Sequence, residues 1–137
     1  MDPGLVACIE DGLQYSMVDY VEARAQKLVY WDTVRPLFEK YDLLLTPTLS
    51  VAAFPVGRLN PEHWSQHVWD WIGWASFSYP FNFTGQPAAS VPAGFTPAGL
   101  PVGLQIVGRR FADLTVLQAS AAFEAARPWA QRRPPID

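Results

Sequence analysis

The chain has 137 residues, of which 50% are hydrophobic, 17% are charged and 14% are aromatic, and its formal net charge is −3. Six Trp, five Tyr and eight Phe bury far more apolar surface than a disordered tail needs. The length favours one globular domain. Ten basic side chains scattered along this mildly acidic chain exclude a nucleic-acid partner and favour neutral partners or substrates.

The N-terminal third predicts a helical region over residues 16–40. Its apolar residues recur at spacings of three, four and seven, as on an amphipathic helix, and Ser16 is placed to cap it. Pro36 removes a backbone donor and disfavours the helical conformation of Arg35. We therefore expect a kink there, or a new short helix over residues 37–40.

The middle of the chain predicts a strand and then a helix. A continuous apolar run over residues 41–46, stopped by Pro47, places a strand within residues 41–48 and indicates that it is covered on both faces, as in a parallel or mixed sheet. Asn60, Pro61 and Glu62 form a helix start, with a capping side chain, a proline and an acid in the first turn. This start predicts a helix over residues 61–75.

Residues 88–107 predict a β-hairpin. Its two apolar strands, 88–93 and 102–107, are joined by a loop rich in Gly and Pro. Pro92 restricts the first strand to an edge, an end or a bulge. In the second strand, alternate side chains are expected to face opposite sides of the sheet.

The C-terminal part predicts a helix over residues 113–127, capped by Asp113, and a solvated tail over 128–137. Together these elements predict an α/β fold in which helices pack on a small mixed sheet that includes the C-terminal β-hairpin. No apolar run approaches the roughly 18 residues of a membrane span, and the segment after Met1 is acidic. Cys8 is the only cysteine, so we expect a cytoplasmic protein without a membrane partner.

The polar residues give no strong catalytic or metal-binding pattern. His63, His67 and Asp70 have the spacing of a metal or proton-relay site, but no fourth ligand is evident. Ser78 and Ser90 lie outside any G-x-S-x-G motif, and both lysines belong to a remote helical region. No catalytic residue, metal or cofactor is therefore predicted.

The densest aromatic cluster spans residues 69–83 and is the candidate substrate-binding wall. Its rings offer flat apolar surfaces, and its polar side chains offer hydrogen-bonding groups, as in the lining of a small-molecule pocket. The alternative, that these rings form core or cover an interface, stays open. The candidate substrate-binding residues are Trp71, Trp74, Phe77, Ser78 and Asn82.

Three segments in this order resemble the C-terminal third of the amidase signature family. They are YDLLLTPT at 41–48, PFNFTGQPAASVPAG at 80–94 and GLPVGLQIVG at 99–108. The resemblance covers the chain from about residue 16 onward. It implies a single α/β domain whose mixed sheet is wrapped in helices, and a reaction that hydrolyses carbon–nitrogen bonds of amides through a Ser-Ser-Lys triad.

The resemblance also implies that the triad is missing. In the family, the triad lies in a Gly-Ser-rich signature and an upstream Lys, both N-terminal of these motifs, and this chain contains no Gly-Gly-Ser-Ser-Gly-like run. We therefore expect the C-terminal segment of an amidase that forms part of the substrate-pocket wall and scaffold and is inactive alone. Gly85 and Gly103 are expected to allow close backbone approach in that scaffold.

Two alternatives remain open. One is a free-standing, amidase-derived binding or interaction module that uses the aromatic face. The other is a piece of the A subunit of a tRNA-dependent glutamine amidotransferase. In those subunits the resemblance places an acidic residue seven positions before the motif Asn, whereas this chain has Ala75, which favours an amide with an apolar or aromatic acyl group. Unpaired strand edges and apolar helix faces predict a homo-oligomer or a partner chain.

Overall fold

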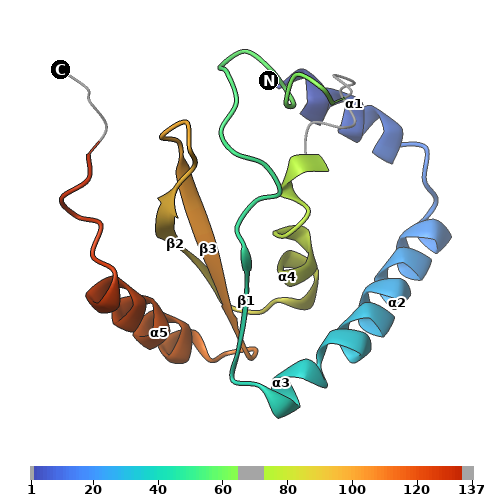
Figure 1. Ribbon diagram of the computed structural model, residues 1–137. Coiled ribbons are helices and arrows are strands. Elements are labelled where there is room, and N and C mark those ends of the chain that lie inside the picture. The colour runs from blue at the N-terminus through green and yellow to red at the C-terminus, as the bar shows by residue number, and fades with distance from the viewer. Residues whose placement is uncertain (1, 65–72, 134–137) are drawn as a thin grey trace.

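The computed structural model describes residues 2–64 and 73–133 (Figure 1). Three helices precede the first strand, and a short helix precedes a hairpin that leads into the last helix (Figure 1). The elements are α1 (Pro3–Gly12), α2 (Met17–Val34), α3 (Leu37–Lys40), β1 (Leu43–Pro47), a 3-10 turn at Gly73–Ala75, α4 (Tyr79–Thr84), β2 (Ala88–Phe95), β3 (Pro101–Gly108) and α5 (Asp113–Ala126). None of these helices is long and apolar enough to cross a bilayer.

The three described strands form one sheet in the order β1-β3-β2, so the hairpin is confirmed. Both pairings are antiparallel, which corrects the expectation of a mixed sheet within this chain. β1 is an edge strand of this sheet, and Leu45 is 57% exposed, so β1 is not covered on both faces. Pro92 lies on the other edge strand and next to a register shift between Pro92 and Gly94, as its missing N–H predicts.

The central strand β3 separates two small cores. Val107, which is fully buried, packs on one face with Val34, Phe38 and Phe81 from α2, α3 and α4. The adjacent residue, Ile106, packs on the other face against α5. This alternation confirms that successive β3 side chains point to opposite faces of the sheet.

Local signals account for the long helices. Ser16 and Asp19 form a reciprocal capping box at the start of α2. The short helix predicted over residues 37–40 is confirmed as α3, but Arg35 keeps a helical conformation (φ −50°, ψ −45°), so the expected effect of Pro36 on Arg35 was wrong. α5 begins at the predicted residue, but the cap assignment was wrong. The N-cap is Ala112 without a side-chain hydrogen bond, and Asp113 is already the first helical residue.

Other helices differ from the prediction. Residues 61–64 are not helical and Gly73–Ala75 is a single turn of 3-10 helix, so neither described end of the helix predicted over 61–75 is α-helical. Its middle, residues 65–72, lies outside the described residues. The helices α1 and α4 were missed, although Asp2 before Pro3 is a helix start and Gly85 ends α4 with a φ of 69°.

Candidate functional site

An open groove lies at the end of the sheet where β1 gives way to the following loop. Its volume is about 670 Å³. The loop after β1 and the tip of the β2–β3 hairpin lie at this same end of the molecule (Figure 1). The groove is lined by Thr48, Leu49, Ser50, Val51, Ala52, Ala53, Phe54, Trp74, Ser90, Pro92, Thr96, Pro101, Val102 and Gly103.

Two hydroxyl groups meet in this groove. The Oγ1 atom of Thr48 lies 2.7 Å from the Oγ atom of Ser90, and either one can be the donor. Gly103 lies directly against them, and its carbonyl oxygen accepts a hydrogen bond of 3.0 Å from the Thr48 N–H. A Cβ atom on Gly103 would lie 2.6 Å from the Thr48 hydroxyl and 2.7 Å from the Ser90 hydroxyl. The predicted close approach at Gly103 is therefore confirmed.

Gly85 has a different role from the one predicted. Apart from its chain neighbours, the nearest described atom to a Cβ atom on Gly85 is Nε of Arg110 at 3.8 Å, so crowding does not require glycine there. Glycine is required there by its φ of 69°, because this left-handed conformation ends α4 and is disfavoured for residues with a Cβ atom.

Trp74 forms a fixed part of the groove wall. Its carbonyl oxygen accepts hydrogen bonds from the backbone N–H and the hydroxyl of Ser50, at 3.2 and 2.7 Å. Its indole N–H donates to the carbonyl oxygen of Leu59 at 3.1 Å, and its ring makes an edge contact with Phe54 at a centroid distance of 5.8 Å. The indole is therefore held at both its polar and its apolar parts.

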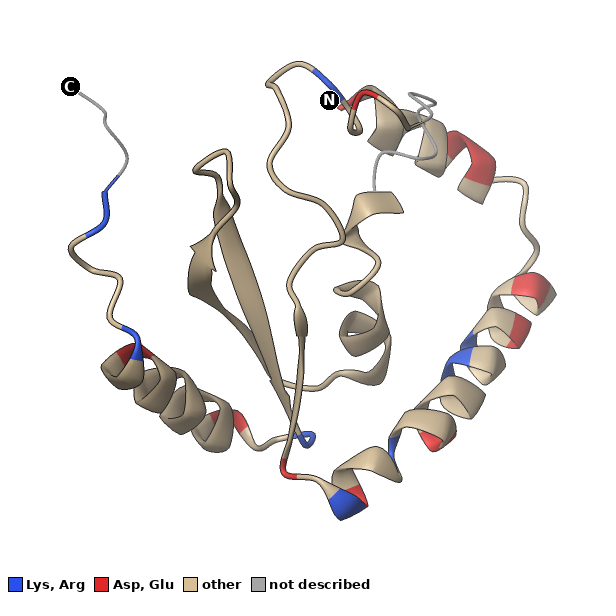
Figure 2. Cartoon of the chain, in the orientation of Figure 1, with Lys and Arg blue, Asp and Glu red and all other residues tan. Residues whose placement is uncertain are grey.

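The lining favours a neutral ligand. Among the residues that the structure describes along the groove, none is charged (Figure 2). The polar side chains are hydroxyls, which both donate and accept hydrogen bonds. Such a surface accommodates an apolar group beside a hydrogen-bonding group such as an amide.

Four of the five predicted wall residues are described by the structure, and of these four only Trp74 lines the groove. Phe77 and Ser78 are half-buried near the start of α4, and the Phe77 carbonyl oxygen accepts a hydrogen bond of 2.9 Å from the Gln105 side chain. Asn82 is exposed on α4. Trp71 lies outside the described residues. The roles proposed for Trp71, Phe77, Ser78 and Asn82 stay predictions.

The hydroxyl pair was missed as a binding feature, since Ser90 was weighed only as a nucleophile. A signal was present in the sequence, because Thr48, Ser90 and Gly103 belong to the three segments that carry the family resemblance. The metal pattern remains weak. His67 and Asp70 lie outside the described residues, and within the residues described no three His, Cys, Asp or Glu side chains are arranged to hold a metal.

Comparison with known sequences shows a consistent set of relatives. A family model described as Amidase matches residues 8–117. The chain is 39% identical over 140 residues to an acylamidase of Rhodococcus erythropolis, covering 98% of this chain and 28% of the relative. It is 37% identical over 115 residues to the A subunit of the glutamyl-tRNA(Gln) amidotransferase of Dehalococcoides mccartyi, covering 84% of this chain and 22% of the relative.

Solved structures agree with this comparison. A bacterial aryl acylamidase of the amidase signature family superposes with a TM-score of 0.76 and 34% identity, covering 98% of this chain and 29% of that chain. A 6-aminohexanoate cyclic dimer hydrolase superposes with a TM-score of 0.83 and 28% identity, covering 98% of this chain and 30% of that chain. This chain thus spans between 22% and 30% of the length of these relatives.

Proposed function

Because the chain belongs to the amidase family, we propose that it supplies one wall of the substrate groove of a carbon–nitrogen amide hydrolase, together with the scaffold of that wall. The uncharged groove with the Thr48–Ser90 hydroxyl pair carries the proposal. The substrate class is a neutral amide with an apolar or aromatic acyl group.

The Thr48–Ser90 hydroxyl pair suits an amide because the two hydroxyls together offer both a hydrogen-bond donor and hydrogen-bond acceptors. One hydroxyl hydrogen is used between Thr48 and Ser90, which leaves the other to donate to a substrate carbonyl oxygen. The remaining lone pairs accept an N–H. Beside the pair, the Trp74 ring offers an apolar surface for the acyl group.

We further propose that the chain binds such amides without hydrolysing them. Its sequence holds no Gly-Ser-rich run of the kind that carries the family's nucleophile, and the hydroxyls in the groove have no Lys or His among the described lining residues. A hydroxyl without a neighbouring base is a weak nucleophile at neutral pH.

A glutamine-directed role, of the kind that the name of one relative indicates for that protein, is the second candidate. The groove itself favours the first candidate. None of the described groove-lining residues is acidic, and the family resemblance places the acidic residue that would hold the amino group of glutamine at the position where this chain has Ala75.

The test is a binding titration of the chain with acetanilide and with glutamine, followed by NMR. We expect acetanilide to bind more tightly, and Thr48→Val to raise its Kd about fivefold because a hydrogen bond contributes about 1 kcal/mol. Thr115→Val, on the exposed surface of α5, is the matched control and leaves the Kd unchanged. Aniline release by the chain is expected to equal that of a heat-inactivated sample.

A different experimental result would contradict each part of the proposal. Tighter binding of glutamine would favour the amidotransferase role, and aniline release above the control would refute the absence of hydrolysis. Failure of the folded chain to bind acetanilide would refute the proposal that the groove forms part of an amide-binding site.

We also propose that a partner chain or a second copy covers the apolar surface of α2 in the cytoplasm. The exposed apolar residues of this helix include Met17, Val18, Val21, Leu28 and Val29. Such a surface favours association because it buries apolar area. Light scattering after size-exclusion chromatography tests this proposal, and a monomer that persists at high concentration contradicts association with a second copy.

A further inference from the structure

A second cavity, which we call the arginine cavity, lies at the opposite end of the β1–β3 pair from the groove. Its volume is about 370 Å³. The register places Leu43 opposite Gly108 at this end and Pro47 opposite Leu104 at the groove end. The cavity is lined by three arginines and three rings: Arg35, Arg109, Arg110, Trp31, Phe38 and Phe111. Glu39 also contributes to its rim.

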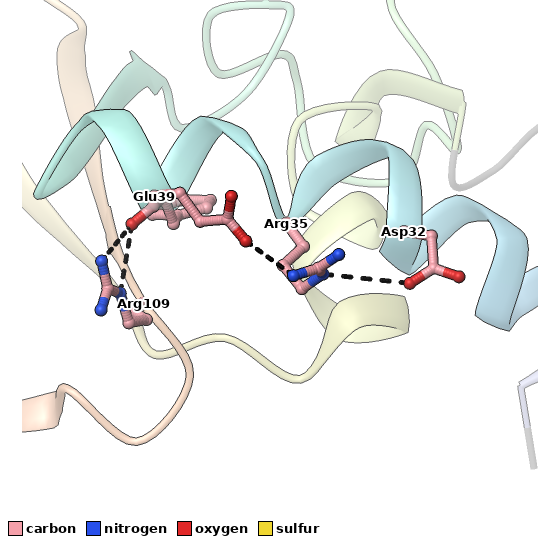
Figure 3. Close-up of polar contacts among 5 residues, drawn as sticks. Asp32, Arg35, Glu39 and Arg109 are labelled. Carbon is pink, nitrogen blue, oxygen red and sulfur yellow. Dashed lines mark hydrogen bonds and ion pairs between the residues drawn. The ribbon is translucent and has the colours of Figure 1, made fainter.

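Two of the arginines are already engaged within the protein. Arg35 pairs with Glu39 at 2.6 Å and with Asp32 at 4.0 Å (Figure 3). Arg109 donates two hydrogen bonds to the main-chain carbonyl oxygen of Phe38, one of them 3.1 Å long from Nε (Figure 3). Arg109 therefore ties the turn after β3 to α3, but its positive charge faces a carbonyl rather than a carboxylate.

Arg110 stacks on two aromatic rings and forms no ion pair within the described part of the chain. Its guanidinium carbon lies 5.3 Å from the centre of the Trp31 ring and 5.1 Å from that of Phe111. Asp42 directly precedes Leu43, which lies opposite Gly108 at this end of the sheet, yet across residues 2–64 and 73–133 no carboxylate pairs with Arg109 or Arg110. The Arg110 guanidinium is thus oriented while its N–H donors remain available to a ligand.

Phe111 adds an independent observation. Its φ is 66°, a conformation that residues with a Cβ atom rarely adopt, and it is the one non-glycine residue with positive φ in the described part of the chain. The residue is 84% exposed at the cavity. The fold therefore holds a large apolar ring in a strained, solvent-facing position beside an unpaired guanidinium, as strained residues at ligand sites do.

We propose that the arginine cavity binds a small carboxylate that carries a flat apolar group, such as an aryl carboxylate. The planar guanidinium of Arg110 matches a carboxylate with two parallel hydrogen bonds, and Arg109 adds a second positive charge. The Arg110 guanidinium lies over one face of the Phe111 ring, and because Phe111 is largely exposed its other face is open for the flat group to stack on. The cavity is within the size range of small-ligand sites.

This inference is independent of the proposed amide groove. The two cavities share no lining residue, and they take ligands of different charge. Binding at one can therefore be measured while the other is blocked or mutated.

The test compares benzoate with benzamide, its uncharged analogue, in NMR titrations of the chain at low salt. We expect benzoate to bind at least about tenfold more tightly, because a charge-assisted pair is stronger than a neutral hydrogen bond. Arg110→Gln is expected to raise the benzoate Kd about tenfold, and Arg110→Lys to raise it less because the charge remains. Arg24→Gln is the matched control, since Arg24 also stacks on a ring, that of Tyr20, but outside the cavity.

Several results would overturn the proposal. These are equal binding of benzoate and benzamide, no saturable benzoate binding, or a folded Arg110→Gln variant with an unchanged Kd. If acetate binds as tightly as benzoate, the aromatic rings do not contribute to binding. If inorganic phosphate binds more tightly than benzoate, the ligand class is a phosphate and not a carboxylate. If Arg110→Gln fails to fold, Arg110→Lys and the benzoate–benzamide comparison in the unmodified chain decide the matter.

Discussion

Gly103→Ala tests the packing that brings the groove hydroxyls together. The new methyl group would lie 2.6 Å from the Thr48 hydroxyl, 2.7 Å from the Ser90 hydroxyl and 3.1 Å from the Thr48 Cβ atom. Two of these distances are too short for any carbon–oxygen contact, so the two side chains must separate. The Thr48–Ser90 hydrogen bond of 2.7 Å is then lost.

The expected destabilisation combines three contributions. Overpacking costs about 1–3 kcal/mol, and the lost hydrogen bond costs about 1 kcal/mol. The reduced backbone freedom of alanine in the unfolded chain offsets about 0.5–1 kcal/mol of this. We expect a net loss of about 2 kcal/mol, which lowers the urea midpoint by about 1 M for an m-value of about 2 kcal/mol/M.

Urea denaturation followed by circular dichroism measures this loss, and two comparisons identify its cause. Gly12→Ala, at the end of α1, is the matched control because no described atom outside its chain neighbours and its own helix backbone lies within 4 Å of the new methyl group, and it is expected to be neutral or slightly stabilising. In a Thr48→Ala/Ser90→Ala background, the penalty of Gly103→Ala should fall by at least about 1 kcal/mol. An undiminished penalty in that background would refute the steric explanation.

Three further predictions concern the capping box, the strained ring and the core. Hydrogen bonds from the side chain and backbone of Ser16 hold the pKa of Asp19 below its ordinary value, so Ser16→Ala should raise that pKa in an NMR titration. The stability advantage of the unmodified chain over Ser16→Ala is then fully present above the ordinary aspartate pKa and shrinks as the pH falls through the lowered one, and thermal melts that show a constant gap would contradict this. Phe111→Gly should be about 1 kcal/mol more stable than Phe111→Ala, because only glycine relieves the positive φ, and equal urea midpoints would show that the turn is unstrained. Val107→Ala should lose about 2 kcal/mol in urea denaturation because Val107 is fully buried, whereas Leu117→Ala, at an exposed position of α5, should stay within about 0.5 kcal/mol.

The parts of the fold that depend on neighbours in the sequence could be predicted. Ser16 and Asp19 are three residues apart and cap α2 without tertiary help, and the short helix predicted after Pro36 begins directly behind that residue. Pro92 likewise restricted its strand to an edge because it cannot donate a hydrogen bond. In these cases, the deciding interaction lies within one turn or one strand.

The parts of the fold and of the site that depend on burial or on contacts between distant segments could not be predicted from the sequence. Asn60 has the identity of a surface helix cap, yet it is completely buried, and no helix begins in the described residues that follow it directly, 61–64. The Thr48–Ser90 pair joins residues 42 positions apart and exists only because β1 and β2 pair with the same strand. Aromatic density pointed to Trp74 but not to the hydroxyls, since the aromatic cluster is contiguous in sequence and the hydroxyl pair is not.

The position of β3 between two edge strands also determines the order in which the molecule can assemble. The β2–β3 hairpin closes locally through the short loop between Phe95 and Pro101. Docking of β1 brings Leu45 opposite Ile106 and must close a loop of about 60 residues. This closure costs more chain entropy than the hairpin turn does, so it is expected to be slower than hairpin formation. Each cavity is lined both by residues from the β1 side of the chain and by residues from the hairpin or the turn after it. Neither binding site therefore exists before β1 docks on β3. A ligand for either cavity should therefore slow the unfolding of the β1–β3 pair without accelerating formation of the hairpin.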